Sequence, residues 1–314
     1  MDPKKSYRPA AGLLLAALIL LAACDTTEPS LHVPEYVVES YQIANEPLKR
    51  VRLSLTEDVN VRYNVTALAV RNANVQVHLL AENGDIERTY PYRALLNEPG
   101  VYEPEQADPV LPKRTYALEI TFPDNTDRIT AQTTVPGAFE ILQSNADRLV
   151  YQDPERLALT VTQSEYATRQ SIFIFSTQAL MPAIENLTPL YLDIIYDVND
   201  LSEVEPGELD PEEMNEFLVG GSPPVNEGNY DINPDGTLVI RLPWFAVVFY
   251  GPNRITASAI DENVYDFVRV LNVQQGGSTL SPGEIPNVLE HIDGGTGIFG
   301  SMARVTAEVY IERR

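Results

Sequence analysis

The stretch YALEITF, residues 116–122, alternates large apolar residues with small or polar ones. A period of two residues puts successive side chains on opposite faces of a β-strand, so this stretch predicts a strand with one buried face. Similar alternation begins at Val51, at Val75 and, close to the end of the chain, at Val305. The recurrence predicts a mainly β fold.

About seven short segments of this kind fall within residues 35–137, and Asn83-Gly84 between two of them is typical of a hairpin turn. Their number and spacing favour an N-terminal immunoglobulin-like β-sandwich. Pro136-Gly137 follows the last segment, and this dipeptide predicts a domain boundary.

Residues 138–314 predict a second, larger β-sandwich-like domain. Its apolar runs are less regular and include a continuous one over Leu190–Tyr196, which we interpret as a buried strand. Two helices are expected, over residues 210–218 and 262–275. The second has apolar side chains at helical spacing and Asp261 and Glu262 at its start, where negative charge stabilises a helix.

The first residues of the chain predict export and lipid attachment. Basic residues precede an apolar run, Gly12–Ala23, which is shorter than the roughly 20 residues that a spanning helix needs. Residues 1–23 therefore predict a signal peptide. Leu21-Ala22-Ala23-Cys24 looks like a bacterial lipobox, and this resemblance implies that Cys24 is lipidated. Residues 24–34 then form a short tether; a plain signal peptide with an incidental cysteine is the alternative.

The chain has 314 residues and a formal net charge of −23, which repels phosphate backbones and excludes nucleic acid as a partner. Ten carboxylates lie between Asp193 and Glu216. A solvated acidic face explains them best, with a cation site, a partner contact or a pair of catalytic carboxylates as alternatives.

Two motifs resemble ligand-binding loops. Asp231, Asn233 and Asp235 have the spacing of the first calcium ligands of an EF-hand, but Leu242 stands where the closing glutamate belongs, so a turn is the preferred interpretation. Gly295–Gly300 matches the dinucleotide-binding pattern G-x-G-x-x-G. The residues after it alternate like a strand, however, and the glycines are better explained by tight turns and close backbone approach.

Trp244, Phe245 and Tyr250 are candidates for ligand or partner contact, with burial in the core of the second domain as the alternative. The three histidines have no metal-ligand spacing, and His78 is expected on the solvent face of its strand. No catalytic motif is present, so the chain is not expected to be an enzyme, and no cofactor is expected apart from the calcium alternative.

A succession of short motifs along the chain looks like a bacterial lipoprotein family, domain of unknown function 4249. The motifs are, in order, Tyr36–Glu39, Val51–Leu55, Gly100–Tyr102, Tyr116–Ile120, Thr133–Pro136, Tyr265–Phe267, Leu271–Gln275 and Asp293–Gly300.

Members of that family are typically encoded beside TonB-dependent outer-membrane receptors. The resemblance implies a lipid-anchored accessory protein of the outer membrane, facing the periplasm or the cell surface, with a TonB-dependent receptor as partner in nutrient uptake and no catalytic residues. The alternatives are a surface adhesion or carbohydrate-binding lipoprotein and a hydrolase that uses the acidic stretch.

Overall fold

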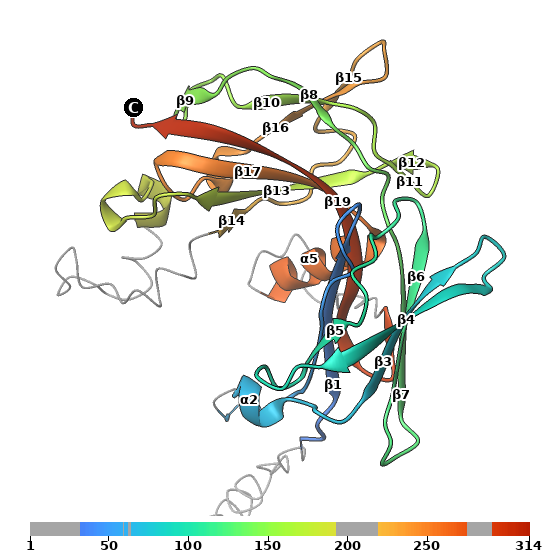
Figure 1. Cartoon of the computed structure of the whole chain (residues 1–314). Coiled ribbons are helices and arrows are strands. Elements are labelled where there is room, and N and C mark those ends of the chain that lie inside the picture. Colours follow the sequence, from blue (N-terminus) through green and yellow to red (C-terminus); the bar gives the residue numbers. More distant parts are fainter. Residues whose placement is uncertain (1–31, 59, 62–63, 193–218, 275–290) are drawn as a thin grey trace, which may run out of the picture.

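The computed structural model describes residues 32–58, 60–61, 64–192, 219–274 and 291–314. The chain is mainly β, with 50% strand and 9% helix, which confirms the predicted fold class. Its strands form two sandwich-like parts set at an angle to each other (Figure 1). We call them the first and the second sandwich. None of the helices among these residues is long and apolar enough to cross a membrane.

The first sandwich is built mostly from the N-terminal half of the chain. Alternation produces it as expected: in β6, Tyr116, Leu118 and Ile120 are buried, and the residues between them are half-buried. Its elements are β1 (Tyr36–Ile43), β2 (Val51–Leu55), α2 (Val65–Leu68), β3 (Asn74–Leu80), β4 (Ile86–Ala94), β5 (Val101–Pro104), β6 (Thr115–Thr121) and β7 (Arg128–Thr134).

These strands are hydrogen-bonded in the order β1–β2–β5–β4–β3–β6–β7. Strand β4 changes neighbour along its length, since Ile86–Pro91 pairs with β3 and Tyr92–Ala94 pairs with β5. It therefore joins the two layers of the first sandwich.

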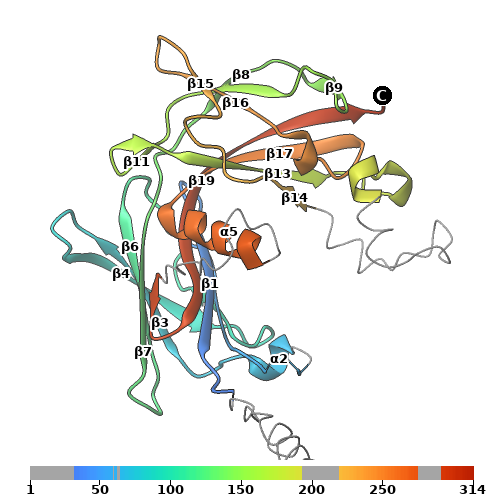
Figure 2. The same ribbon diagram turned by 180° about the vertical axis from the view of Figure 1, so that it is seen from behind.

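The second sandwich packs two sheets against each other (Figure 2). One sheet has the order β14–β13–β17–β19 with β9 beside β19, and the other has the order β15–β16–β10–β8. The strands and short helices of this half, with two small strands beside the joint, are β8 (Ile141–Ser144), β9 (Arg148–Val150), β10 (Ala158–Val161), β11 (Glu165–Tyr166), β12 (Arg169–Gln170), β13 (Ile172–Ala179), η1 (Ile184–Asn186), β14 (Val219–Gly221), β15 (Asp231–Ile232), β16 (Leu238–Arg241), η2 (Trp244–Ala246) and β17 (Gly251–Ile260).

The last elements, β18 (Ile292–Asp293) and β19 (Thr296–Glu312), join the two sandwiches. Strand β18 pairs with β7. Strand β19 pairs in parallel with β1 through Thr296–Met302 and then antiparallel with β17 through Met302–Ile311. Residues 138–314 were expected to form the second domain, but Ile292–Asp293 and Thr296–Met302 pair with strands of the first sandwich. One unbroken strand thus belongs to both sheets.

A single apolar core follows this shared strand. It includes Val38 and Leu118 of the first sandwich, Phe299 of β19, and Phe173 and Ile240 of the second sandwich, all of them buried. Each large apolar side chain buried in this way contributes about 1.5–3 kcal/mol to stability. The two sandwiches therefore share packing as well as a strand.

Helix α5 (Glu262–Gln274) matches the helix predicted over residues 262–275. It lies beside the joint (Figures 1 and 2), and Val264 on its first turn packs with Ile260 and Ile298. The helix predicted over residues 210–218 falls outside the described residues.

Candidate functional site

A buried polar cluster lies where β7, β17 and β19 meet. Its centre is the carboxylate of Asp261, which is 1% exposed and follows directly after β17. Asp261 caps α5 by accepting a hydrogen bond from the backbone amide of Val264 at 2.9 Å. Thr133 of β7 donates a hydrogen bond to the same carboxylate, and the Ser301 hydroxyl of β19 lies 3.3 Å from it. Three segments far apart in the sequence therefore converge on one carboxylate.

Burial raises the pKa of Asp261 to about 6, although its hydrogen bonds to Thr133, Val264 and Ser301 work in the opposite direction. Desolvation penalises the charged form of a carboxyl group, and here this effect is the larger one. Perturbed carboxyl groups are common at functional sites and also in structural networks. At Asp261 the partners are hydroxyls and backbone amides that join elements, so a structural role fits the geometry.

The start of α5 is held from other directions as well. The side-chain amide of Asn263 donates to the backbone carbonyls of Gln132 at 2.6 Å and Phe299 at 2.7 Å. Arg169, in the β11–β12 hairpin, forms an ion pair with Glu262 at 2.9 Å. These contacts fix the helix to both sandwiches.

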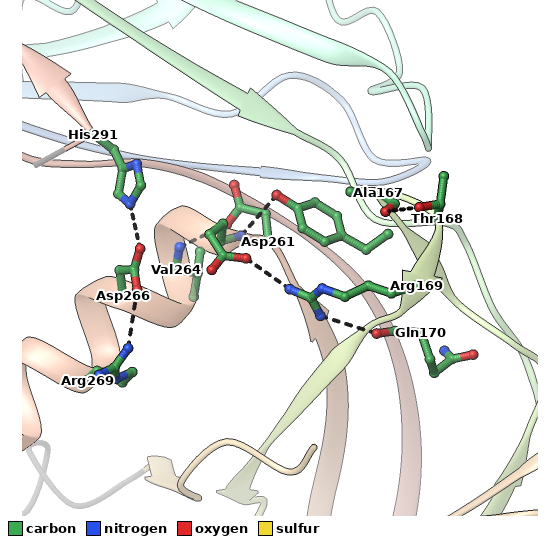
Figure 3. A network of polar contacts seen from close by, with 11 residues as sticks. Ala167, Thr168, Arg169, Gln170, Asp261, Val264, Asp266, Arg269 and His291 are labelled. Atoms are coloured by element: carbon green, nitrogen blue, oxygen red, sulfur yellow. Dashed lines mark hydrogen bonds and ion pairs between the residues drawn. The ribbon is translucent and has the colours of Figure 1, made fainter. Parts of the chain in front are cut away.

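A second acid–base pair lies further along α5 (Figure 3). His291 Nε2 is 2.8 Å from Asp266 Oδ2, and Asp266 is almost completely buried. In a catalytic triad the imidazole is also hydrogen-bonded to a hydroxyl or thiol nucleophile. Among the described residues, no hydrogen bond joins His291 to a hydroxyl or thiol. The pair anchors the segment before β18 to α5.

The aromatic residues predicted for ligand contact do not form one exposed platform. Trp244 is half-buried, and its Nε1 donates to the backbone carbonyl of Asp153 at 3.0 Å. Trp244 and Tyr250 both contact the ring of Tyr151 edge-on, at centroid distances of 5.6 and 5.5 Å. Phe245, in contrast, is 40% exposed. Of the three predicted residues, Phe245 has the largest exposed fraction.

The weak calcium candidates lie in the β15–β16 hairpin, where other groups engage their side chains. Asp231 forms an ion pair with Arg241 at 2.7 Å, and Asn233 donates to the hydroxyl of Thr237 at 2.8 Å. Asp235 accepts from the backbone amide of Thr237 at 3.0 Å. Within the described part of the chain, no group of three or more His, Cys, Asp or Glu side chains is placed to hold a metal ion. In the structure the three residues thus belong to a hairpin whose turn is held by hydrogen bonds to Thr237.

Two predicted sites cannot be placed. Cys24 and the acidic stretch over residues 193–216 both lie outside the described residues.

The described part of the first sandwich includes a larger and a smaller recess. The larger, about 750 Å³, lies over β1, β2 and β5, and its basic side chains are paired with acids: Arg50 with Glu98 at 3.1 Å, and Arg304 with Glu46 at 2.6 Å. The smaller, about 400 Å³, lies over β6 and β7 and includes His78. His78 shares a row with Ala117 and the exposed Gln132 on the outward face of the sheet, but the expected exposure is wrong, because its side chain is almost completely buried. Both volumes are within the range of small-ligand sites.

Comparison with known proteins identifies the family. A family model described as a domain of unknown function, DUF4249, matches residues 24–308. The chain belongs to the DUF4249 family. The matched range begins at Cys24, the residue that the lipobox resemblance marks as lipidated, and reaches into the second half of β19. Both sandwiches of this DUF4249 protein thus contribute strands to the matched range. Among curated proteins, none matches the chain.

Several solved structures are similar at low identity. Salmonella alpha-2-macroglobulin has 10% identity and a TM-score of 0.22, with 91% of this DUF4249 chain and 16% of that chain covered. The three N-terminal domains of the bacteriophage RB49 outer capsid protein Hoc have 8% identity and a TM-score of 0.24, with 90% and 71% covered. Human protocadherin-24 EC1-2 has 9% identity and a TM-score of 0.18, with 90% and 100% covered. At these TM-scores the likeness carries no argument about function.

Asp261 gives a testable dependence of stability on pH. Its ordinary pKa is 3.8 and its folded pKa is about 6, so between these values the folded protein holds a proton that the unfolded chain releases. This contribution is fully present below pH 4 and is lost as the pH rises through 6, a decrease of about 3 kcal/mol. Asparagine keeps the helix cap but does not ionise. We therefore compare the free energies of unfolding of the Asp261→Asn and wild-type proteins, measured with urea. Between pH 4 and pH 7 the difference should shift in favour of Asp261→Asn by about 3 kcal/mol.

The control is Asp235→Asn. Hydrogen bonds from Thr237 lower the pKa of the exposed Asp235, so this substitution should give no such gain. Parallel pH profiles for the wild type and the Asp261→Asn protein would contradict the assignment.

Proposed function

We propose that the protein is a lipid-anchored binding protein of the outer membrane that assists a TonB-dependent receptor in nutrient uptake and catalyses no reaction. The observation that carries this proposal is the lipobox-like Leu21–Cys24, followed by a tether too polar to pack in a core. Several acyl chains on one cysteine give stable anchoring, since each buried CH₂ contributes about 0.8 kcal/mol.

The architecture suits a protein held at one end. Strand β1, the first after the tether, begins at the end of the first sandwich that faces away from the second sandwich (Figure 1). The shared strand β19 and the cluster around Asp261 fix the two sandwiches to each other. A tether at the start of β1 therefore leaves the second sandwich on the far side of the molecule, where it can reach a partner.

Phe245 is the candidate contact on the second sandwich. Its ring is 40% exposed, and its backbone carbonyl accepts a hydrogen bond from the Tyr191 hydroxyl at 2.9 Å, which holds the segment in place. Exposed aromatic side chains on a rigid support are frequent anchors of protein interfaces.

Co-purification from membranes solubilised in a mild detergent tests the proposal. We expect a tagged wild-type protein to bring down a receptor-sized outer-membrane protein in near-equal amount. Phe245→Ser should reduce this recovery. Leu142→Ser, which alters another exposed apolar side chain of the second sandwich, 56% exposed, should leave it unchanged. Recovery of the wild-type protein as a lone monomer would contradict the proposed partnership.

The two alternative functions have less support. An adhesion or carbohydrate-binding site built on Trp244 loses part of its platform, because that ring is half-buried and its Nε1 is hydrogen-bonded within the protein. A hydrolase that uses the carboxylates of residues 193–216 depends on a segment outside the described residues.

A further inference from the structure

The 400 Å³ recess on the first sandwich has the features of a ligand site. We call it the His78 recess. The β3–β4 hairpin projects from the side of the first sandwich (Figures 1 and 2), and its residues Leu80 and Ile86 form one wall. The outward faces of β6 and β7 form the floor. Ile86 is 57% exposed, so this wall offers an apolar surface beside a polar floor.

The strand register explains why the floor is hollow. His78 of β3 lies opposite Ala117 of β6, and Ala117 lies opposite Gln132 of β7. In the next row on the same face, Glu119 lies opposite Thr130. The small methyl group of Ala117 thus stands between larger polar side chains and leaves space above it.

His78 is buried with one ring nitrogen unsatisfied. Its Nδ1 is hydrogen-bonded to the Thr89 hydroxyl at 2.9 Å, whereas Nε2 has no hydrogen-bond partner in the described structure. The closest acidic group, Glu119 Oε2, is 3.4 Å from Nε2, within range of an ion pair but without hydrogen-bond geometry. A buried polar atom without a partner has lost the hydrogen bond that water would provide, so it calls for an explanation.

The Glu119 carboxylate links this nitrogen to the recess. Its second oxygen, Oε1, is 3.2 Å from Nε of Arg128, and Glu119 and Arg128 both line the recess. The charges of Glu119 and Arg128 cancel, so the floor attracts neither anions nor cations by net charge. It offers carboxylate acceptors, guanidinium donors and the amide of Gln132, which both donates and accepts.

We propose that the His78 recess binds a small, uncharged, hydroxyl-rich molecule of the sugar class. A hydroxyl group donates and accepts at once, which suits a floor where Glu119 accepts, Arg128 donates and Gln132 does both. The C–H groups of a sugar ring can pack on Leu80 and Ile86. A hydroxyl that donates to Glu119 allows the carboxylate to reorient toward Nε2 of His78, so that binding satisfies the buried nitrogen.

This inference deepens the proposed binding role by naming a ligand class. The ligand titration uses the protein without its partner, and the co-purification uses no added ligand. Either experiment can therefore fail without affecting the result of the other.

The experiment is a titration of the isotope-labelled wild-type protein with glucose, galactose, mannose, N-acetylglucosamine and maltose, followed by NMR. We expect at least one sugar to shift the signals of residues lining the recess, with a dissociation constant on the order of 1 mM. Acetate and ammonium serve as charged probes and should produce no comparable shift.

Variants locate the binding. Ala117→Leu fills the recess and should abolish the response, with the dispersion of the remaining spectrum reporting that the protein is folded. Gln132→Ala should weaken binding by about tenfold. Gln143→Ala, an equally exposed glutamine on β8 of the second sandwich, should leave it unchanged. The proposal is overturned if no sugar shifts these signals at about 50 mM, if only a charged probe does, or if the folded Ala117→Leu protein responds like the wild type.

Discussion

Replacing Cys24 by serine is expected to abolish lipid attachment and to move the protein from the membrane fraction to the soluble fraction. The proposal that Cys24 carries the lipid rests on the lipobox-like Leu21–Cys24, and Cys24 is the only cysteine in the sequence. A single acyl chain binds a bilayer only marginally and two or more bind it stably, so removal of the acceptor changes anchoring from nearly complete to nearly absent.

Two measurements check this expectation in cells grown with a clickable palmitate analogue: incorporation of label into the protein, and its distribution after membrane sedimentation. Thr27→Ser, a conservative change in the tether, is the matched control and should retain label and membrane association. Label incorporated equally into the Cys24→Ser protein would contradict lipidation at this residue, whichever fraction contains it.

The strands could be predicted where a segment has one buried and one exposed face. In β6 the large apolar residues Tyr116, Leu118 and Ile120 are the buried ones. In β7 the apolar Ile129 and Ala131 are likewise buried, whereas Thr133 is polar and yet buried. The alternation from Val305 onward predicts a strand, and these residues lie in β19. The strand also extends back through Gly297 and Gly300, where tight turns are among the expectations. Helix α5 had both signals that a helix needs: apolar spacing and an acidic start.

Other features depend on contacts that a sequence pattern does not contain. His78 lies at a position where alternation predicts exposure, yet its side chain is almost completely buried beside Thr89 and Glu119. The run Leu190–Tyr196 was interpreted as a strand, but its described part, Leu190–Leu192, is helical. A continuous apolar run fits either state by periodicity alone, and here the Thr188 carbonyl accepts hydrogen bonds from the next turn.

The candidate aromatic site shows the same limit. Trp244 and Phe245 are neighbours in the sequence, but the turn of η2 points them to different surroundings, one half-buried against Tyr151 and the other exposed. Composition identifies which residues can recognise a partner. Only the local backbone decides which of them is available to do so.

The sharing of β19 by both sandwiches is the feature least visible in the sequence, and it is why a small change at Gly297 is expected to have a large effect. Gly297 has a φ of +102°, and a Cβ atom there would lie 2.1 Å from the backbone oxygen of Val38, its partner in β1. Backbone cannot rotate away as a side chain can, so alanine at this position must separate β1 from β19. We expect Gly297→Ala to lower the free energy of unfolding by about 3 kcal/mol or more, from backbone strain and lost pairing together.

Gly84→Ala separates these two contributions. Gly84 also has a positive φ, +86°, but a Cβ atom there would meet nothing within 4 Å. Its replacement by alanine should cost about 1 kcal/mol through backbone strain alone. Urea unfolding followed separately by tryptophan fluorescence and by far-ultraviolet circular dichroism checks both values. Trp244 reports on the second sandwich, so if β19 couples the two sandwiches, Gly297→Ala should shift both transitions together although the substitution lies in the first. Equal losses for the two variants, or a fluorescence transition that Gly297→Ala leaves in place, would show that the contact between β1 and β19 does not hold the second sandwich in its folded state.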